Sequence, residues 1–290
     1  MELVKLKIPK MRNILNTLQY AHFSAHCNSC FVYCCTMRQP VVSSWNLLVK
    51  RFLHTNNAVQ FAKQQPNNLK GKSKSSQDWL TRQLADPYVE KARMLNFRCR
   101  SAFKLLEMDD KYKILKPGDV VLDCGAAPGS WTQVAAERTN ANGKTERMPR
   151  GAVYSIDLLH FHAVPGATIF GGMDFTSPLA QQRLRESLAG RSVNCVLSDM
   201  APNATGVRML DQESITNLCY EVLRFALAMS APQANLVVKI WDNGDVPKLE
   251  RDILCYYEKV KRVKPRASRG DSAEHFLLAR GFKGLAPTAT

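Results

Sequence analysis

Short apolar runs alternate with helix-like stretches from residue 120 onward, and this alternation constrains the fold more than any other feature of the chain. Strands rich in Val, Ile and Leu that are separated by helices form a mainly parallel sheet covered on both faces. The predicted strands are Val120–Asp123, Ala152–Ile156, Ala167–Phe170, Asn194–Ser198, Leu236–Ile240, Lys259–Val263 and His275–Ala279. The last two are too close for a helical crossover, so we expect an antiparallel hairpin at the sheet edge. The chain is therefore predicted to be an α/β protein with a seven-stranded sheet and helices on both faces.

The N-terminal quarter of the chain differs in composition from the rest. No acidic residue occurs between Glu2 and Asp78, and residues 1–77 hold eleven of the 40 Lys and Arg residues that give the 290-residue chain its net charge of +15. A basic segment without acidic residues that is rich in Ser, Asn and Gln is typical of an organellar transit peptide. We predict a mitochondrial transit peptide over residues 1–55, a flexible basic linker over 56–77 and one catalytic domain over 78–290.

Two alternatives for this N-terminal segment stay open. Met37 opens a stretch that would make a compact presequence on its own, ending near Thr55, so residues 1–36 could be an upstream extension. The same composition would also serve a disordered basic tail that holds RNA by charge alone.

The nine cysteines give no sign of a metal site or of disulfide bonds. Cys27, Cys30, Cys34 and Cys35 lie together near two histidines, His22 and His26, but a zinc module needs paired ligands separated by a structured stretch. The other five are scattered singly, as is typical of buried thiols in a reducing compartment. They are Cys99, Cys124, Cys195, Cys219 and Cys255. No run of 18 apolar residues occurs, so we expect no transmembrane span.

Basic residues mark a candidate surface for RNA. Apolar residues recur at helical spacing between Tyr88 and Asp110 and are interleaved with Lys and Arg, which predicts a helix with one packed face and one basic face. A second basic group lies near the C-terminus, and contacts of this kind to phosphates position RNA without reading its sequence. The candidates are Arg93, Arg98, Arg100, Lys104, Lys261, Arg262, Lys264, Arg266 and Arg269. The alternative for individual members is an ordinary solvated charge.

A glycine-containing loop follows the first predicted strand and precedes a predicted helix at Thr132–Glu137. The loop reads CGAAPGSW, and its Gly125 and Gly129 would let the backbone approach a ligand closely at the carboxyl end of the strand. The dinucleotide pattern GxGxxG and the phosphate-binding pattern GxxxxGK[ST] are both absent. The loop therefore favours S-adenosylmethionine, whose sulfonium and amino groups would find an electrostatic partner in Asp123.

Two further acidic residues follow the next two strands. Asp157 ends the second strand and could accept hydrogen bonds from ribose hydroxyls, and Asp174 follows the third and could accept one from an adenine amino group. Each alone would more often be a helix cap or a turn carboxylate. Three carboxylates after three successive strands favour a cofactor pocket. The polar stretch 138–151, which separates the first strand's helix from the second strand, is predicted to be a surface loop.

Five motifs together resemble the FtsJ/RrmJ family of RNA ribose 2′-O-methyltransferases. They are FKL at 103–105, DCGAAPGSW at 123–131, SDMAPN at 198–203, VVKIW at 237–241 and KPRASRGDSAEHF at 264–276. They occur in the family's order, and the resemblance spans about Asp86 to Gly281. It implies a Rossmann-like fold that uses S-adenosylmethionine and modifies RNA. With the transit-like N-terminus, it further implies a uridine of mitochondrial large-subunit rRNA in a pre-ribosomal particle of the matrix.

The resemblance also assigns roles to residues of this chain. It implies a catalytic Lys-Asp-Lys-Glu tetrad of Lys104, Asp199, Lys239 and Glu274. The implied cofactor-binding residues are Asp123, Gly125, Ala126, Pro128, Gly129, Ser130, Trp131, Asp157, Asp174 and Asp199. Ser130 stands where many members have glycine. A tRNA substrate and a non-enzymatic role in ribosome assembly are the alternatives, and a monomer is the simplest expected state.

The tetrad has a chemical rationale. A ribose 2′-hydroxyl is a poor nucleophile until a base removes its proton in line with the methyl group. Lys239 is the candidate base, although it could instead only orient the hydroxyl. Asp199 and Glu274 would orient the two ammonium groups. A lone strand-end lysine more often extends to solvent, but a lysine directly after Leu236–Val238 in a buried strand costs several kcal/mol unless it is paired.

Overall fold

The computed structural model describes residues 71–285 except 72, 85, 203–204 and 243–244. The predicted transit peptide, the N-terminal cysteine and histidine cluster and most of the predicted linker therefore lie outside the described residues. The first described helix, α2 (Lys74–Leu84), begins before residue 78, where the sequence predicts the catalytic domain to start. All described residues belong to one compact unit.

A seven-stranded sheet forms the centre of this unit. Its strands are β1 (Val120–Cys124), β2 (Ala152–Asp157), β3 (Ala167–Gly171), β4 (Val193–Ser198), β5 (Ser230–Trp241), β6 (Tyr257–Val263) and β7 (Glu274–Phe282). Their order is β3-β2-β1-β4-β5-β7-β6; β1 to β5 are parallel, and β7 is antiparallel to both β5 and β6. The predicted sheet and its antiparallel edge hairpin are thus confirmed, with β7 inserted between β5 and β6.

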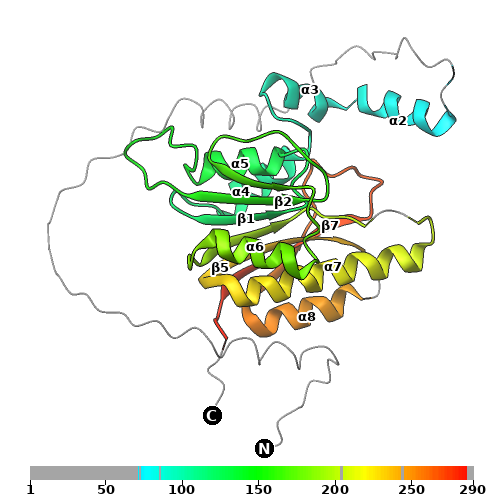
Figure 1. Cartoon of the computed structure of the whole chain (residues 1–290). Helices are drawn as coiled ribbons and strands as arrows, with labels where there is room; N and C mark the ends of the chain where they lie inside the picture. The colour runs from blue at the N-terminus through cyan, green and yellow to red at the C-terminus, as the bar shows by residue number, and fades with distance from the viewer. Residues whose placement is uncertain (1–70, 72, 85, 203–204, 243–244, 286–290) are drawn as a thin grey trace, which may run out of the picture. The chain divides into compact units, whose positions relative to one another are not determined.

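Helices cover both faces of the sheet, as predicted. The helices on the two faces are α4 (Ala102–Tyr112), α5 (Ser130–Arg138), α6 (Pro178–Leu188), α7 (Arg208–Met229) and α8 (Val246–Tyr256), and α3 (Pro87–Met94) precedes them in the chain. Helices α4 and α5 lie on one face, and α6, α7 and α8 lie on the other (Figure 1). Coverage from both sides explains why β1 and β4 are buried along almost their whole length.

A buried apolar cluster lies between the sheet and helices α6 to α8. Leu184 of α6 and Val222 and Phe225 of α7 are fully or almost fully buried there, and the rings of Phe175 and Phe225 meet edge to face at 5.6 Å. Burying an aliphatic or aromatic side chain of this size contributes about 1.5–3 kcal/mol. This packing holds the parallel strands in register, so the positions of their carboxyl ends are fixed.

The prediction of one helix between Tyr88 and Asp110 is wrong, because the segment forms two helices, α3 and α4, with a break between them. Helix α3 ends at Met94, and Asn96 has a left-handed backbone with φ of 57°, a conformation that asparagine tolerates better than most residues. Arg98 and Arg100 therefore lie in the connection between α3 and α4, not on a helix face. Repeating apolar residues on both sides of this break gave the segment a helical pattern.

The predicted surface loop after α5 is confirmed. Residues 143–150 are exposed, and the chain forms no strand or helix until β2 begins at Ala152. The base of the loop is nevertheless ordered by buried Asn140, whose Nδ2 donates to the carbonyls of Thr145 and Met148 at 2.9 and 3.1 Å.

The prediction that five scattered cysteines are buried is correct for Cys124, Cys195 and Cys219 only. Cys99 is half-buried. Cys255 is exposed because α8 buries a stripe that includes Leu249 and Ile253, and Cys255 lies off that stripe. Within the described residues, no helix is long and apolar enough to cross a membrane, and no group of His, Cys, Asp or Glu is arranged to bind a metal.

Candidate active site

Strand register brings two of the predicted catalytic residues together. In the parallel pair β4–β5, Ser198 lies opposite Val238, so Asp199 and Lys239 emerge side by side at the carboxyl edge of the sheet. In the antiparallel pair β5–β7, Trp241 lies opposite Glu274, which places Glu274 at the same edge. Lys104 comes from helix α4, which packs on one face of the sheet. The Lys104 ammonium lies 5.7 Å from the ring centre of Phe276 in β7.

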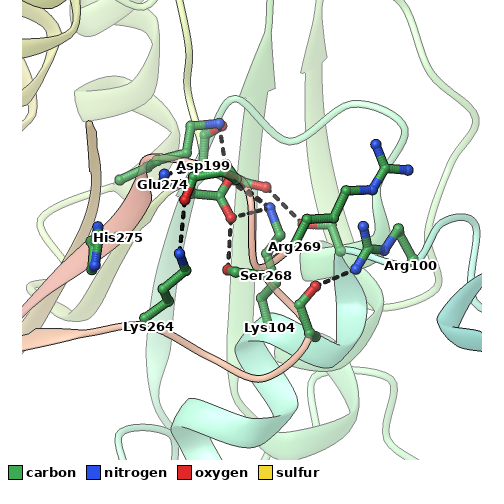
Figure 2. A network of polar contacts seen from close by, with 12 residues as sticks. Arg100, Lys104, Asp199, Lys264, Ser268, Arg269, Glu274 and His275 are labelled. Atoms are coloured by element: carbon green, nitrogen blue, oxygen red, sulfur yellow. Dashed lines mark hydrogen bonds and ion pairs between the residues drawn. The ribbon is translucent and has the colours of Figure 1, made fainter. Parts of the chain in front are cut away.

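The four side chains form a row of alternating charges. Lys239 Nζ lies 3.0 Å from Asp199 Oδ1 and donates to the Asp199 carbonyl oxygen at 2.5 Å. Lys104 Nζ lies 3.9 Å from the same Oδ1, and 2.7 and 2.8 Å from the two carboxylate oxygens of Glu274. Figure 2 shows Lys104, Asp199 and Glu274 pointing toward one another. The structure thus brings Lys104, Asp199, Lys239 and Glu274 into one group.

The surroundings of Asp199 keep it ionised. Burial by itself would raise the pKa of this carboxyl, but the Lys239 and Lys104 ammonium groups and a hydrogen bond from Ser101 outweigh burial. The pKa of Asp199 therefore lies below its ordinary value. Lys239 has only 9% of its surface exposed, so a lasting negative charge beside it is what makes its burial tolerable.

Two serines that the sequence analysis did not single out bind the tetrad carboxylates. Ser101 Oγ donates to Asp199 Oδ2 at 2.7 Å, and Ser268 Oγ donates to Glu274 Oε1 at 2.8 Å. Ser101 lies three residues before Lys104, a spacing that puts both on one side of a helical turn. That spacing, and the place of Ser268 inside the motif that ends with Glu274, are the signals that could have revealed them.

The cofactor loop has the backbone conformation that its glycines allow. Gly125 and Gly129 have φ of 76° and 103°, and a Cβ atom on Gly125 would lie 2.5 Å from Met200 Cγ. Asp157 ties the loop to β2, because its carboxylate oxygens accept from the backbone N–H groups of Ala127 and Leu159 at 2.8 and 2.7 Å.

A pocket of about 580 Å³ opens beside this loop, within the range of small-molecule sites. Its wall includes Gly125 and three of the predicted acidic residues, Asp157, Asp174 and Asp199. Apolar side chains complete it, among them Leu158, Phe175 and Met200. Carboxylates and apolar side chains in one pocket suit a ligand with an aromatic base, hydroxyl groups and positive charge, so these residues fit S-adenosylmethionine.

The structure places Asp123 beneath the loop, not in the pocket wall. Its side chain is fully buried and accepts a hydrogen bond from Thr132 Oγ1 at 2.7 Å, and the Thr132 hydroxyl lies 2.9 Å from that of Ser155. Burial, together with the nearby carboxylates of Asp199 and Asp157, raises the pKa of Asp123 to about 7 despite the Thr132 hydrogen bond. A direct contact of Asp123 with a ligand is therefore not what this geometry offers, because α5 packs over it.

Three of the remaining predicted cofactor residues, Pro128, Ser130 and Trp131, contact the connection between α3 and α4. Trp131 Nε1 donates to the Ser101 carbonyl at 2.9 Å, and Ser130 Oγ lies 3.0 Å from Cys99 Sγ. Arg98 Nη1 donates to the Pro128 carbonyl at 2.8 Å. Ala126, Pro128, Gly129, Ser130 and Trp131 are not among the pocket-lining residues, and their part in cofactor binding stays a prediction.

Residues 97–282 match the FtsJ-like methyltransferase family. The chain belongs to this family. Mitochondrial rRNA methyltransferase 2 of Drosophila melanogaster is 83% identical over 244 residues, which cover 84% of this chain and 98% of that protein. Ribosomal RNA large subunit methyltransferase E of Rhodopseudomonas palustris strain HaA2 is 45% identical over 216 residues, covering 74% of this chain and 89% of that protein.

A solved structure has the same fold as this FtsJ-like chain. A ribosomal RNA methyltransferase of Plasmodium falciparum superposes with a TM-score of 0.57 at 25% identity and covers 65% of this chain and 100% of that chain. The predicted family and fold are thus confirmed. All four tetrad residues lie within the FtsJ-like range, whereas Asp86 and helix α3 precede it.

Many of the basic residues predicted to face RNA have partners among the described residues of this chain. Arg262 pairs with Asp242 and Glu250 at 2.8 and 3.0 Å, and Lys264 donates to the carbonyls of Gly270 and Ser272. Besides Lys104, Arg98 and Arg100 are also engaged, Arg98 with three carbonyl groups and Arg100 with Asp86 at 3.0 Å. Internal pairing lowers the share of this charge that is free to attract phosphates.

Proposed function

We propose that this chain transfers a methyl group from S-adenosylmethionine to a ribose 2′-hydroxyl of rRNA, with Lys104, Asp199, Lys239 and Glu274 as its catalytic group. One observation carries the proposal: Asp199 both lines the pocket and lies 3.0 Å from Lys239 Nζ. A ligand bound in the pocket and a ribose hydroxyl beside Lys239 would therefore both lie next to the Asp199 carboxylate. When bound, S-adenosylmethionine supplies a methyl group on a positively charged sulfur.

Lys239 is the residue that would act on the hydroxyl. An ammonium group has three N–H donors, and two directions from Lys239 Nζ are occupied by the Asp199 carboxylate and carbonyl. We expect the third to face the ribose hydroxyl, which fixes its lone pair toward the methyl group. As an ammonium, Lys239 would only hold the hydroxyl while the proton leaves late. To act as a general base it must first give up one proton, so that the lone pair of the neutral amine accepts the hydroxyl proton.

The other three side chains would hold Lys239 and the substrate in place. Asp199 fixes the direction of the Lys239 ammonium, and Glu274 holds Lys104 through both carboxylate oxygens. Held in this way, Lys104 adds positive charge next to the site where the oxygen becomes more negative. Asp157 and Asp174 would bind the adenosine part of the cofactor, and Gly125 would let its methionine part lie close to the backbone.

The names of the relatives support a substrate and a compartment. The Drosophila relative is named as a mitochondrial rRNA methyltransferase and the bacterial one as a large subunit rRNA methyltransferase. We therefore infer that the chain acts in the mitochondrial matrix on large-subunit rRNA. Beyond these names, we propose a uridine target within a pre-ribosomal particle and, as the simplest state, a monomer. The acid-free N-terminal segment agrees with import into mitochondria.

The first test compares the full-length chain with its Lys239→Ala variant. Both are incubated with radiolabelled S-adenosylmethionine and rRNA or ribosomal precursors from cells that lack this protein, and alkali-resistant 2′-O-methyl positions are mapped. We expect label at one ribose, with a loss of at least about 100-fold in the variant because its hydroxyl is no longer oriented or deprotonated. Calorimetry should show nearly unchanged cofactor binding.

The matched control is Lys248→Ala, which removes an exposed lysine from helix α8 and should leave methylation unchanged. Full activity of Lys239→Ala would remove this lysine from the mechanism. Label on tRNA, with none on any rRNA substrate, would move the proposal to a tRNA enzyme. Cofactor binding without any methylation would favour a role in ribosome assembly.

A further inference from the structure

We propose that Ser268 and Asp86 are positioning residues for Glu274. They belong to a set of contacts, which we call the α3 brace, formed by Asp86, Arg100, Glu107 and the loop 265–269. The inference rests on the proposed role of the tetrad and goes beyond it, because Asp86 precedes the FtsJ-like range and neither residue belongs to the tetrad.

The first step is the contact between Ser268 and Glu274. Ser268 is buried, and its hydroxyl donates at 2.8 Å to the same Glu274 oxygen, Oε1, that lies 2.7 Å from Lys104 Nζ. Figure 2 shows Ser268 and Lys104 approaching this carboxylate together. Two donors on one carboxylate oxygen restrict the rotamers that Glu274 can adopt, so Ser268 helps to fix where Glu274 holds Lys104.

The second step is the attachment of the loop that carries Ser268. The neighbouring residue Ala267 is fully buried; its N–H donates to Glu107 Oε2 at 3.2 Å, and its carbonyl accepts from Arg100 Nη2. The Ser268 N–H closes a turn by donating to the Pro265 carbonyl at 2.9 Å. The loop is thus held at its backbone by side chains from α4 and from the connection that precedes it.

The third step leads from this attachment to Asp86. One Asp86 oxygen, Oδ2, lies 3.0 Å from Arg100 Nη1 and 3.7 Å from Arg269 Nε, while Oδ1 accepts from the Tyr88 N–H at 3.0 Å and so caps helix α3. The Asp86 side chain has only 9% of its surface exposed. Figure 2 shows Arg100 and Arg269 next to each other, as expected of two cations that share an anion.

Glu107 completes the brace from α4. Its Oε1 accepts from the Tyr88 hydroxyl at 3.1 Å, so one carboxylate joins α3 to the loop through Tyr88 and Ala267. Burial, followed by the Glu107 charge and hydrogen bond, raises the pKa of Tyr88 to about 12, which keeps this hydroxyl a donor at physiological pH. The path from Asp86 to Glu274 therefore consists of buried or half-buried contacts, which water screens weakly.

The test at Ser268 compares the full-length Ser268→Ala and Ser268→Thr variants with the wild type. We expect Ser268→Ala to lower kcat about 10-fold or more, the loss typical of a hydrogen bond to a charged group, with KM and Kd for S-adenosylmethionine unchanged. Ser268→Thr keeps the hydroxyl and should recover most of kcat. Equal kcat in Ser268→Ala and wild type would overturn the inference, and so would an equal loss in both variants.

The test at Asp86 uses a matched carboxylate-to-amide pair on one helix. Asp86→Asn should lower kcat about 10-fold, because a small displacement of a catalytic group is costly, and should again leave cofactor affinity unchanged. Glu90→Gln removes the Glu90 charge of the exposed Glu90–Arg93 pair and should change nothing. Rates are divided by the concentration of cofactor-binding sites from calorimetry, so a partly unfolded variant is not mistaken for a slow one.

The double variant Asp86→Asn/Ser268→Ala tests whether the two residues act through one path. A double variant that is about as slow as the slower single variant supports the path, whereas losses that multiply would contradict it. Failure of the proposed function would look different, because the wild type itself would then not methylate rRNA. The inference alone fails when the wild type methylates rRNA, Lys239→Ala does not, and the brace variants match the wild type.

Discussion

At the scale of single residues, Asp199 connects ligand binding to the proposed chemistry. Asp199 forms part of the pocket wall. Its Oδ2 accepts a hydrogen bond from Ser101 Oγ at 2.7 Å, and its Oδ1 lies 3.0 Å from Lys239 Nζ. Asp123 is the fourth residue of β1, and no ammonium group in the described part of the chain lies close enough to offset the effect of burial on its carboxylate. The pKa values of these two aspartates at neighbouring strand ends are thus shifted in opposite directions because of their neighbours.

The raised pKa of Asp123 predicts a pH-dependent effect on stability. Between the ordinary pKa of 3.8 and about 7, the unfolded chain has lost the Asp123 proton while the folded chain still holds it. The free energy of unfolding of the wild type therefore falls as pH rises through this range. Asp123→Asn removes this loss, so between pH 5 and pH 8 its stability relative to wild type should rise by about 2–3 kcal/mol.

Urea unfolding of both proteins at pH 5, 6.5 and 8, without cofactor, measures this difference. Asn at this position can still accept the Thr132 hydrogen bond, which limits the disturbance of packing. Parallel stability curves for the two proteins across this pH range would show that Asp123 does not retain its proton in the folded state.

At the scale of secondary-structure elements, the connection between α3 and α4 does more than join two helices. Its Arg98 donates to the carbonyls of Pro128, His162 and Ala163 at 2.8, 2.7 and 2.6 Å. It thereby ties the cofactor loop after β1 to the loop after β2, which begins directly after Asp157 and carries Leu158 of the pocket wall. The helix break that the sequence pattern missed is what brings Arg98 there.

Arg98→Ala should therefore weaken cofactor binding more than it slows the chemistry. Hydrogen bonds from a charged donor contribute about 1.5–3 kcal/mol each, and only part of this is lost when water replaces the guanidinium, so we expect Kd for S-adenosylmethionine to rise about 10-fold. Isothermal calorimetry measures the affinity, and single-turnover rates at saturating cofactor measure the chemistry. Arg93→Ala, which removes an exposed arginine of α3, is the control. An unchanged Kd would show that the two loops hold their places without Arg98.

At the scale of the whole molecule, most of the fold was predictable from the sequence. All seven strands lie where alternating apolar runs indicated, and the closeness of the last two runs correctly predicted their antiparallel pairing. The errors arose where a pattern continued across a change of structure. Apolar spacing ran through the break at Asn96, and β5 begins at Ser230, six residues before its predicted start at Leu236.

The candidate site was predictable in its members but not in its contacts. Motifs pointed to Lys104, Asp199, Lys239 and Glu274, and the structure brings all four together. The hydroxyl donors Ser101 and Ser268 were missed because serine is common and its role depends on what its hydroxyl meets. The α3 brace was missed because its members are up to 183 residues apart, from Asp86 to Arg269, and single charges carry no spacing signal.

The secondary-structure elements, the glycine loop after β1 and the family of this protein can be read from its residues alone, because apolar periodicity, glycine positions and short motifs are local properties of a chain. Three-dimensional packing was needed to show which of the acidic strand ends faces the pocket, which carboxylates share a lysine and which basic residues are already paired. These outcomes depend on strand register, on how α4 and α5 pack against the sheet and on side-chain rotamers. Each of these is fixed by contacts between residues far apart in sequence, and such contacts leave no local pattern.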